Sequence, residues 1–137
     1  MAVCLDSWAV LHWLEGVEPS AKRVERAIED GALMSWVNVG EVAYVVARKA
    51  GDAASQEVTR ELRRRVQLEV PTPERFLDAA RLKAQHRLAY PDAIAIATAK
   101  ANRADLLTGN PDLLRGDPSW QTIDLRTGKG TKKGARA

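Results

Sequence analysis

The sequence predicts one α/β domain in which helices sandwich a central, mainly parallel β-sheet. Two observations carry this prediction. Short apolar segments alternate along the chain with longer helical patterns, and no repeat or linker interrupts the series before the last twelve residues. The 137 residues, 45% of them hydrophobic, suffice for one domain with its own core. We therefore expect a domain over residues 1–125 and a tail over residues 126–137.

The chain begins with a strand, a turn and two helices. "AVCL" (2–5) is a short apolar run, and the helical pattern "WAVLHWLEG" (8–16) follows after two polar residues. A second, exposed helix is expected over residues 19–31, with Ser20 as its potential cap and Gly31 at its end.

The middle of the chain repeats the order of strand and helix. "ALMSWV" (32–37) is a strand candidate, and "NVGEVAYVVARKAG" (38–51) is a helix that stops at a glycine. A charged amphipathic helix over residues 52–66 leads to a possible strand, "QLEV" (67–70). The next helix is expected over residues 72–88.

The last elements centre on an apolar helix. "YPDAIAIATA" (90–99) has Pro91 in a first turn and no charge after Asp92, so this helix should be packed on every side. "ADLLT" (104–108) is a strand that breaks at "GNPD", and "WQTIDL" (120–125) is the final strand.

Several classes of protein are excluded by composition. The single cysteine, Cys4, rules out a disulfide framework and is compatible with a reducing compartment. No stretch approaches the roughly 18 apolar residues of a membrane span, and the N-terminus lacks a signal-type pattern. We expect a soluble, cytoplasmic protein that does not contact membranes.

The net charge of +3 is located mainly in the tail. Five basic residues and no acid lie in residues 126–137, so the rest of the chain has 16 basic against 18 acidic residues, a net of −2. This Gly- and Lys-rich tail lacks hydrophobic periodicity and is expected to be disordered. It is either a solubilising end or a weak, salt-sensitive contact to nucleic acid.

Polar residues gather where the predicted strands end. Asp6 follows the first strand, Glu41 lies early in the helix after the second, and Asn110 and Asp112 follow "DLLT". Asp92 begins the apolar helix and can project to the same place. In a parallel sheet the carboxyl ends of the strands form one edge, where ligands bind.

If three carboxylates lie close together, a cation is needed to offset their mutual repulsion. Two charges about 5 Å apart repel by roughly 3 kcal/mol at an effective dielectric of 20, so three pairs cost on the order of 10 kcal/mol. Oxygen ligands without a His or Cys cluster favour Mg²⁺ or Mn²⁺ over Zn²⁺. Each acid also has a local alternative: Asp6 as a helix cap, Glu41 and Asp92 as first-turn acids, and Asp112 as a turn residue.

Three segments, in this order, resemble the PIN domain, and most closely the VapC toxins of prokaryotic toxin–antitoxin pairs. They are "VCLDSWAVLHWLEG", "VNVGEVAYVVARKAG" and "YPDAIAIATAKANRADLLTGNPDLL". The resemblance runs over about residues 2 to 125 and includes the apolar surroundings of each acid.

The resemblance implies a metal-dependent endoribonuclease that hydrolyses RNA phosphodiester bonds with Mg²⁺ or Mn²⁺. It implies that the protein is the toxin of a VapBC-type pair, a homodimer inhibited by its cognate VapB-type antitoxin. Asp6, Glu41 and Asp92 match the family's three central acids, as catalytic residues and metal ligands, with Glu41 acting directly or through water. The supporting polar residues are Ser7, Asn38 and Thr108.

The sequence departs from the family at one position. The family usually has a further aspartate after "LTG", and here Asn110 occupies that place. An amide oxygen can still bind a cation but brings no negative charge. Asn110 and Asp112 are therefore weaker candidate ligands. The alternative function is a PIN-like RNA-binding or regulatory module with weakened catalysis.

A phospho-accepting receiver domain also gathers acids at strand ends. It needs an adjacent acidic pair and a lysine after a late strand, and neither "VCLDSW" nor "DLLTGN" supplies them. The sequence therefore does not favour a receiver domain.

The remaining polar and aromatic residues are less informative. The pattern at Arg63 to Arg65 is typical of a solvated helix face, and the alternative is that these arginines contact RNA. Trp8 and Trp13 are either core residues or partly exposed at the edge of a groove, and the resemblance to VapC toxins implies that a segment of the antitoxin crosses this early helix. His12 and His86, which lack partners at ligand spacing, are expected in surface or packing roles.

Overall fold

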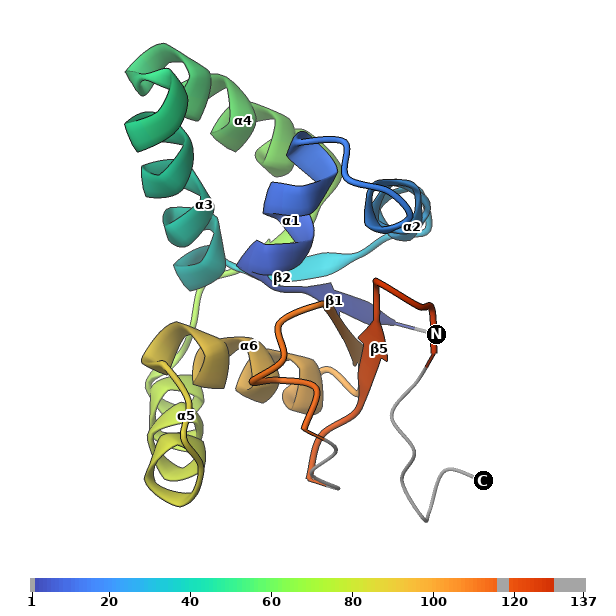
Figure 1. Ribbon diagram of the computed structural model, residues 1–137. Helices are drawn as coiled ribbons and strands as arrows, with labels where there is room; N and C mark the ends of the chain where they lie inside the picture. Colours follow the sequence, from blue (N-terminus) through green and yellow to red (C-terminus); the bar gives the residue numbers. More distant parts are fainter. Residues whose placement is uncertain (1, 116–118, 130–137) are drawn as a thin grey trace.

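The computed structural model describes residues 2–115 and 119–129 and has one five-stranded sheet between two layers of helices (Figure 1). The strands are β1 (Val3–Leu5), β2 (Leu33–Ser35), β3 (Gln67–Glu69), β4 (Asp105–Thr108) and β5 (Thr122–Asp124). The helices are α1 (Ser7–Leu14), α2 (Ser20–Glu29), α3 (Trp36–Ala50), α4 (Asp52–Arg65), α5 (Pro73–Gln85) and α6 (Tyr90–Ala101).

Every strand pairing in the sheet is parallel, with the order β3-β2-β1-β4-β5. The central strand β1 contacts β2 on one side and β4 on the other, with Leu5 opposite Leu107. The predicted α/β sandwich is confirmed. Because all strands run the same way, the segments after β1, β2 and β4 leave the sheet at one edge.

The two faces of the sheet are covered by different helices. Figure 1 shows α1 to α4 on one face and α5 with α6 on the other. Leu5, Met34 and Leu107 belong to the core beneath α1 to α4, whereas Cys4 and Leu106 pack towards α5 and α6. This alternation is the period of two expected for strands buried on both faces.

Helix α6 has the all-round burial that its composition predicts. Residues 93–99 are all buried, and the single carboxylate in its first turn, Asp92, is half-buried at the carboxyl edge of the sheet. The helix therefore holds Asp92 on a rigid, buried base.

Two expected element boundaries are wrong. Helix α3 begins at Trp36, inside the strand expected over 32–37, because Ser35 accepts a hydrogen bond from the backbone N–H of Val37 (3.1 Å) and starts the helix. Ser20 does not cap α2 either. Its hydroxyl donates to the carbonyl of Leu125 (3.3 Å) and so links α2 to the end of β5.

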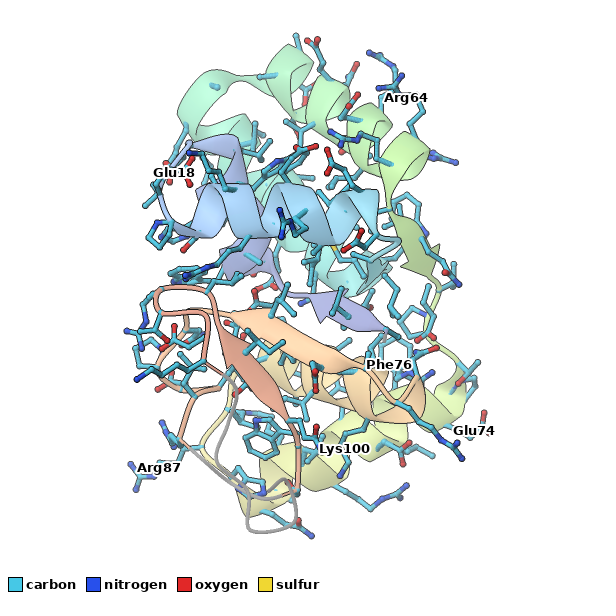
Figure 2. The ribbon with its side chains drawn as sticks, turned by 90° about the vertical axis from the view of Figure 1, so that its right-hand side faces the viewer. Glu18, Arg64, Glu74, Phe76, Arg87 and Lys100 are labelled. Carbon is cyan, nitrogen blue, oxygen red and sulfur yellow. The ribbon has the colours of Figure 1, made fainter. Side chains whose placement is uncertain are left out.

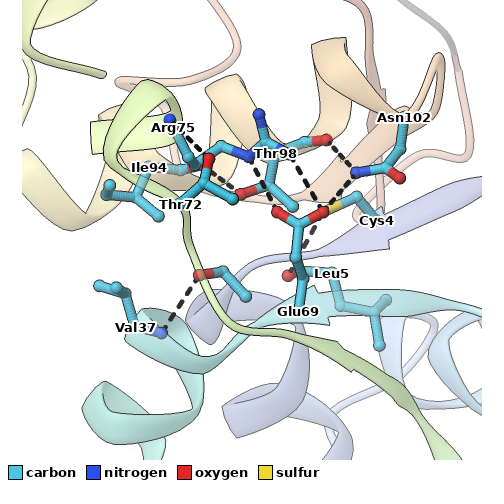
Figure 3. Close-up of polar contacts among 10 residues, drawn as sticks. Cys4, Leu5, Val37, Glu69, Thr72, Arg75, Ile94, Thr98 and Asn102 are labelled. Atoms are coloured by element: carbon cyan, nitrogen blue, oxygen red, sulfur yellow. Dashed lines mark hydrogen bonds and ion pairs between the residues drawn. The ribbon is translucent and has the colours of Figure 1, made fainter. Parts of the chain in front are cut away.

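A half-buried ion pair joins β3 to α5, and a hydrogen bond joins β3 to the residue that follows α6. Arg75 of α5 donates to both carboxylate oxygens of Glu69, at 2.8 and 3.1 Å, and Asn102 after α6 donates to the same carboxylate at 3.0 Å (Figure 3). These contacts lower the pKa of Glu69, the hydrogen bond from Arg75 contributing most. The edge strand is thus fixed to α5 and α6.

The first residues of the expected tail fold back on β5. Residues 125–127 form a turn in which the backbone N–H of Asp124 donates to the carbonyl of Lys129 (2.9 Å), and Arg126 pairs with Asp124 (2.9 Å). The rest of the tail, residues 130–137, lies outside the described residues. Within the described part of the chain, no helix is long and apolar enough to cross a bilayer.

Candidate active site

Asp6 forms the floor of the site because β1 ends directly before it. Asp6 is only 2% exposed, and its carboxyl group is held from two elements. Oδ1 accepts from the backbone N–H of Ala9 (2.8 Å), which makes Asp6 the N-cap of α1, and Oδ2 accepts from the hydroxyl of Thr108 at the end of β4. The side chain of Asp6 can therefore cap α1 and belong to the shared site at the same time.

The segment after β4 forms one wall of the site. The backbone N–H of Asn110 donates to the hydroxyl oxygen of Thr108 (3.0 Å), and its side-chain amide donates to Oδ2 of Asp92 (3.4 Å). The amide oxygen of Asn110 accepts from the backbone N–H of Asp112 (3.0 Å). Asn110 thus connects the end of β4 to α6 and directs its N–H, rather than its oxygen, towards Asp92.

The start of α3 contributes the third acid, Glu41. Asn38 is 1% exposed, and its amide nitrogen donates to Oε1 of Glu41 (2.9 Å) and to the carbonyl of Pro91 (3.1 Å). Its amide oxygen is, among the described residues, a buried polar side-chain atom without a hydrogen-bond partner. Asn38 therefore holds Glu41 beside the first turn of α6.

The carboxyl groups interact electrostatically across the site. Burial raises the pKa of Asp6 from 3.8 to about 7; the hydrogen bonds from Thr108 and Ala9 oppose this, and the charges of Asp92 and Glu41 add to it. For Asp92, burial and then the charge of Glu41 raise the pKa to about 6. The three predicted acids therefore sense one another, although they are far apart in sequence.

The other predicted residues lie at the margin of this cluster. Asp112 is exposed, and although its charge raises the pKa of Asp92, its carboxylate pairs with Arg115 (2.8 Å). Ser7 is the half-buried first residue of α1, next to Asp6. Both remain less central than Asp6, Glu41 and Asp92.

A family model of the PIN domain matches residues 3–117. The chain belongs to the PIN-domain family. None of the curated proteins compared with this PIN domain matches it.

Solved structures share the fold of this PIN domain. A DNA-bound VapBC from Salmonella typhimurium has a TM-score of 0.74 and 12% identity, over 91% of this chain and 98% of that chain. VapC20 of Mycobacterium tuberculosis, a sarcin-ricin loop cleaving toxin, has a TM-score of 0.69 and 18% identity, over 81% and 92%. A toxin–antitoxin complex from Klebsiella pneumoniae has a TM-score of 0.68 and 20% identity, over 85% and 93%.

The donors of this PIN domain fit a divalent cation in chemistry and charge. All of them are oxygens, and the raised pKa values of Asp6 and Asp92 mark carboxyl groups whose negative charge is poorly compensated. The unpartnered amide oxygen of Asn38 is a further oxygen near Glu41. However, no group of three His, Cys, Asp or Glu residues within 2–115 and 119–129 is arranged so that it could hold an ion. The amides of Asn38 and Asn110 instead hold two of the carboxylates.

The sequence did not decide whether Trp8 lies in the core or at the edge of a groove. Trp8 packs against Gly109, which lies between Thr108 and Asn110 in the sequence. The Trp8 ring also stacks on the ring of His12. A glycine directly after a buried strand is the signal for such close approach. His86 packs edge-on against Trp120, with ring centroids 5.1 Å apart, in the packing role expected for it.

The arginines of α4 have contacts within the protein. Arg63 lies over the ring of Trp36 (5.4 Å), and Arg65 pairs with Glu25 (2.5 Å). Arg64 projects outward from α4 in Figure 2 and pairs with Glu61 (2.6 Å). These contacts fit the solvated helix face expected for them.

Proposed function

We propose that this protein is a divalent-metal-dependent endoribonuclease that hydrolyses RNA phosphodiester bonds, acting as the toxin of a VapBC-type pair. The observation that carries the proposal is the acid cluster: Asp6, Glu41 and Asp92 come from three elements, and burial and mutual repulsion raise the pKa of two of them. Membership of the PIN-domain family and the shared fold of VapC structures support it.

In this proposal Asp6, Asp92 and Glu41 hold Mg²⁺ or Mn²⁺, Glu41 directly or through water, with Asn110 and Asp112 as weaker ligands. When bound there, the cation would supply Lewis-acid activation of the attacking water and would offset charge on the phosphate in the transition state. Water adds to phosphorus, the bond to the leaving oxygen breaks, and that oxygen takes up a proton from solvent water. Glu41, half-buried at the opening of the site, takes the proton released by the water.

The chain's own contacts would prepare the site for this reaction. Thr108 and the N-terminus of α1 fix Asp6, whereas Asn38 fixes Glu41 against the first turn of α6. Helix α6 holds Asp92 on a buried base. Each carboxylate is therefore anchored by its own contacts, although, among residues 2–115 and 119–129, no three acids are yet arranged to hold one ion, so ion binding would draw them closer together.

The partners follow from the same comparisons. Two of the solved structures with this fold are a VapBC complex and a toxin–antitoxin complex. We propose that a VapB-type antitoxin binds and inhibits this protein and that the protein forms a homodimer. Sedimentation of the purified protein, alone and with a co-expressed antitoxin, tests both points.

The decisive experiment is metal-dependent cleavage of RNA by the protein purified free of any partner. Cellular RNA is incubated with Mn²⁺ or Mg²⁺, and cleavage ends are mapped for the parent and for Asp92→Asn and Asp6→Ala. We expect cleavage only by the parent and only with the metal. Equal cleavage by the parent and the variants would contradict the proposal.

One observation favours a second candidate function, an RNA-binding or regulatory module. Asn110 replaces the usual fourth acid and turns its amide N–H towards Asp92. If the purified protein binds RNA but cleaves none with either metal, this function replaces the first.

A further inference from the structure

Trp8 is built into the wall of the acid cluster. A Cβ added to Gly109 would lie 2.2 to 2.6 Å from three carbons of the Trp8 ring, so the ring rests directly on the backbone there. The neighbours of Gly109 on either side are Thr108 and Asn110, which contact Asp6 and Asp92. The Trp8 indole therefore packs on the residue that separates Thr108 from Asn110, the two residues that hydrogen-bond to Asp6 and Asp92.

A second ring extends this surface. His12 lies one helical turn after Trp8, and the two rings stack with centroids 3.6 Å apart and planes inclined by 15°. The Nδ1 of His12 is 2.9 Å from the carbonyl oxygen of Trp8. A carbonyl accepts only, so Nδ1 carries the proton, and this hydrogen bond fixes the ring orientation. Both side chains are half-buried and keep part of their surface open to solvent.

The two rings already contact each other, so a base cannot enter between them and can add only to an outer face of the pair. Proteins that bind single-stranded RNA use aromatic rings as platforms for unstacked bases.

We propose that Trp8 and His12 form a base-stacking subsite, which binds an unpaired base of single-stranded RNA next to the phosphate in the acid cluster. The proposal rests on the proposed function, because it assigns the position of a nucleotide that flanks the cleaved bond. Because stacking tolerates every base, the subsite selects unpaired RNA rather than one sequence.

The same helix supplies a matched control. Trp13 is also half-buried, but its indole N–H donates to Glu25 (2.9 Å), and Arg65 lies over its ring (5.7 Å). These contacts turn Trp13 towards α2 and α4. Removing its ring changes a tryptophan of α1 without touching the subsite.

The test measures binding of fluorescein-labelled octauridine by anisotropy. The full chain carries Asp92→Asn to prevent cleavage and is compared with the same chain carrying Trp8→Leu, Trp8→Phe or Trp13→Leu. We expect Trp8→Leu to raise Kd roughly tenfold to hundredfold, whereas Trp8→Phe and Trp13→Leu stay within a few-fold of the parent.

Abasic probes test the subsite without altering the protein. Octauridines that lack one base at successive positions are bound to the Asp92→Asn chain with and without Trp8→Leu. We expect one abasic position to weaken binding as much as Trp8→Leu does and to add nothing in that variant.

The outcomes separate this proposal from the proposed function. If the wild-type protein cleaves RNA with Mn²⁺ but no abasic position weakens binding, the stacking subsite is wrong and the nuclease stands. Unchanged Kd for a folded Trp8→Leu chain also overturns it. If the wild-type protein neither binds nor cleaves RNA, both proposals fall.

Discussion

Replacing Asp6 by asparagine should make the protein more stable while abolishing its activity. The carboxyl group of Asp6 is almost fully buried, and burial, with smaller contributions from Asp92 and Glu41, raises its pKa from 3.8 to about 7. Above pH 7 the folded protein must therefore hold a poorly solvated negative charge. Asparagine has the same shape and no charge, and it can still accept from the backbone N–H of Ala9.

The magnitude follows from proton linkage. A pKa difference of this size corresponds to about 4 kcal/mol. The folded state binds the proton more tightly than the unfolded state, so the contribution of Asp6 to stability is full below pH 3.8 and is lost as pH rises to about 7. The Asp6→Asn variant should thus gain roughly 2 kcal/mol over the parent at pH 5 and up to about 4 kcal/mol at pH 8.

Urea unfolding in EDTA between pH 5 and pH 8, followed by circular dichroism, measures this difference. The control is Asp112→Asn, an exposed carboxylate paired with Arg115, whose effect should stay within about 0.5 kcal/mol. If Asp6→Asn is no more stable than the parent at pH 8, or if the difference does not grow with pH, the electrostatic reasoning is wrong. Cleavage of RNA by the same variant is expected to be lost, so stability and activity should change in opposite directions.

Three further substitutions test other parts of the structure. Gly109→Ala should cost about 2–3 kcal/mol in urea unfolding, because the new methyl group overlaps the ring of Trp8; an unchanged midpoint would contradict that contact. Asn110→Asp should tighten Mn²⁺ binding at least about tenfold by calorimetry, since it adds a negative charge to the site, and an unchanged titration would place the side chain outside the metal's ligands. Arg75→Met should cost about 1–3 kcal/mol because it strips a half-buried carboxylate of its main partner, whereas Arg81→Met, which breaks an exposed pair, should cost less than about 0.5 kcal/mol; equal costs would refute the difference in burial.

Much of this fold was predictable because each element has a local cause. Alternating apolar strands and helical patterns predict a parallel sheet, and such a sheet brings the residues after its strands to one edge. That is why Asp6 and the segment at Asn110 could be placed together from the sequence. Asp92 could be placed because an apolar helix with one acid in its first turn must open towards solvent there.

The contacts that hold the site were less predictable. The amide of Asn38 joins Glu41 to the carbonyl of Pro91, a contact between residues 53 apart that no local pattern encodes. The stop of β2 at Ser35 also depends on a side-chain hydrogen bond, whereas "ALMSWV" by composition alone reads as one strand. Both cases are tertiary or capping interactions that override local propensity.

The hydrogen bond between Thr108 and Asp6 spans 102 residues of chain. During synthesis β1 emerges early, but the strand that completes its carboxyl edge follows only near the end of the domain. An amino-terminal fragment that ends before β4 lacks Thr108 and Asn110, so such a truncated product should be inert. If the protein is a toxin, activity begins only when translation of the domain is nearly complete.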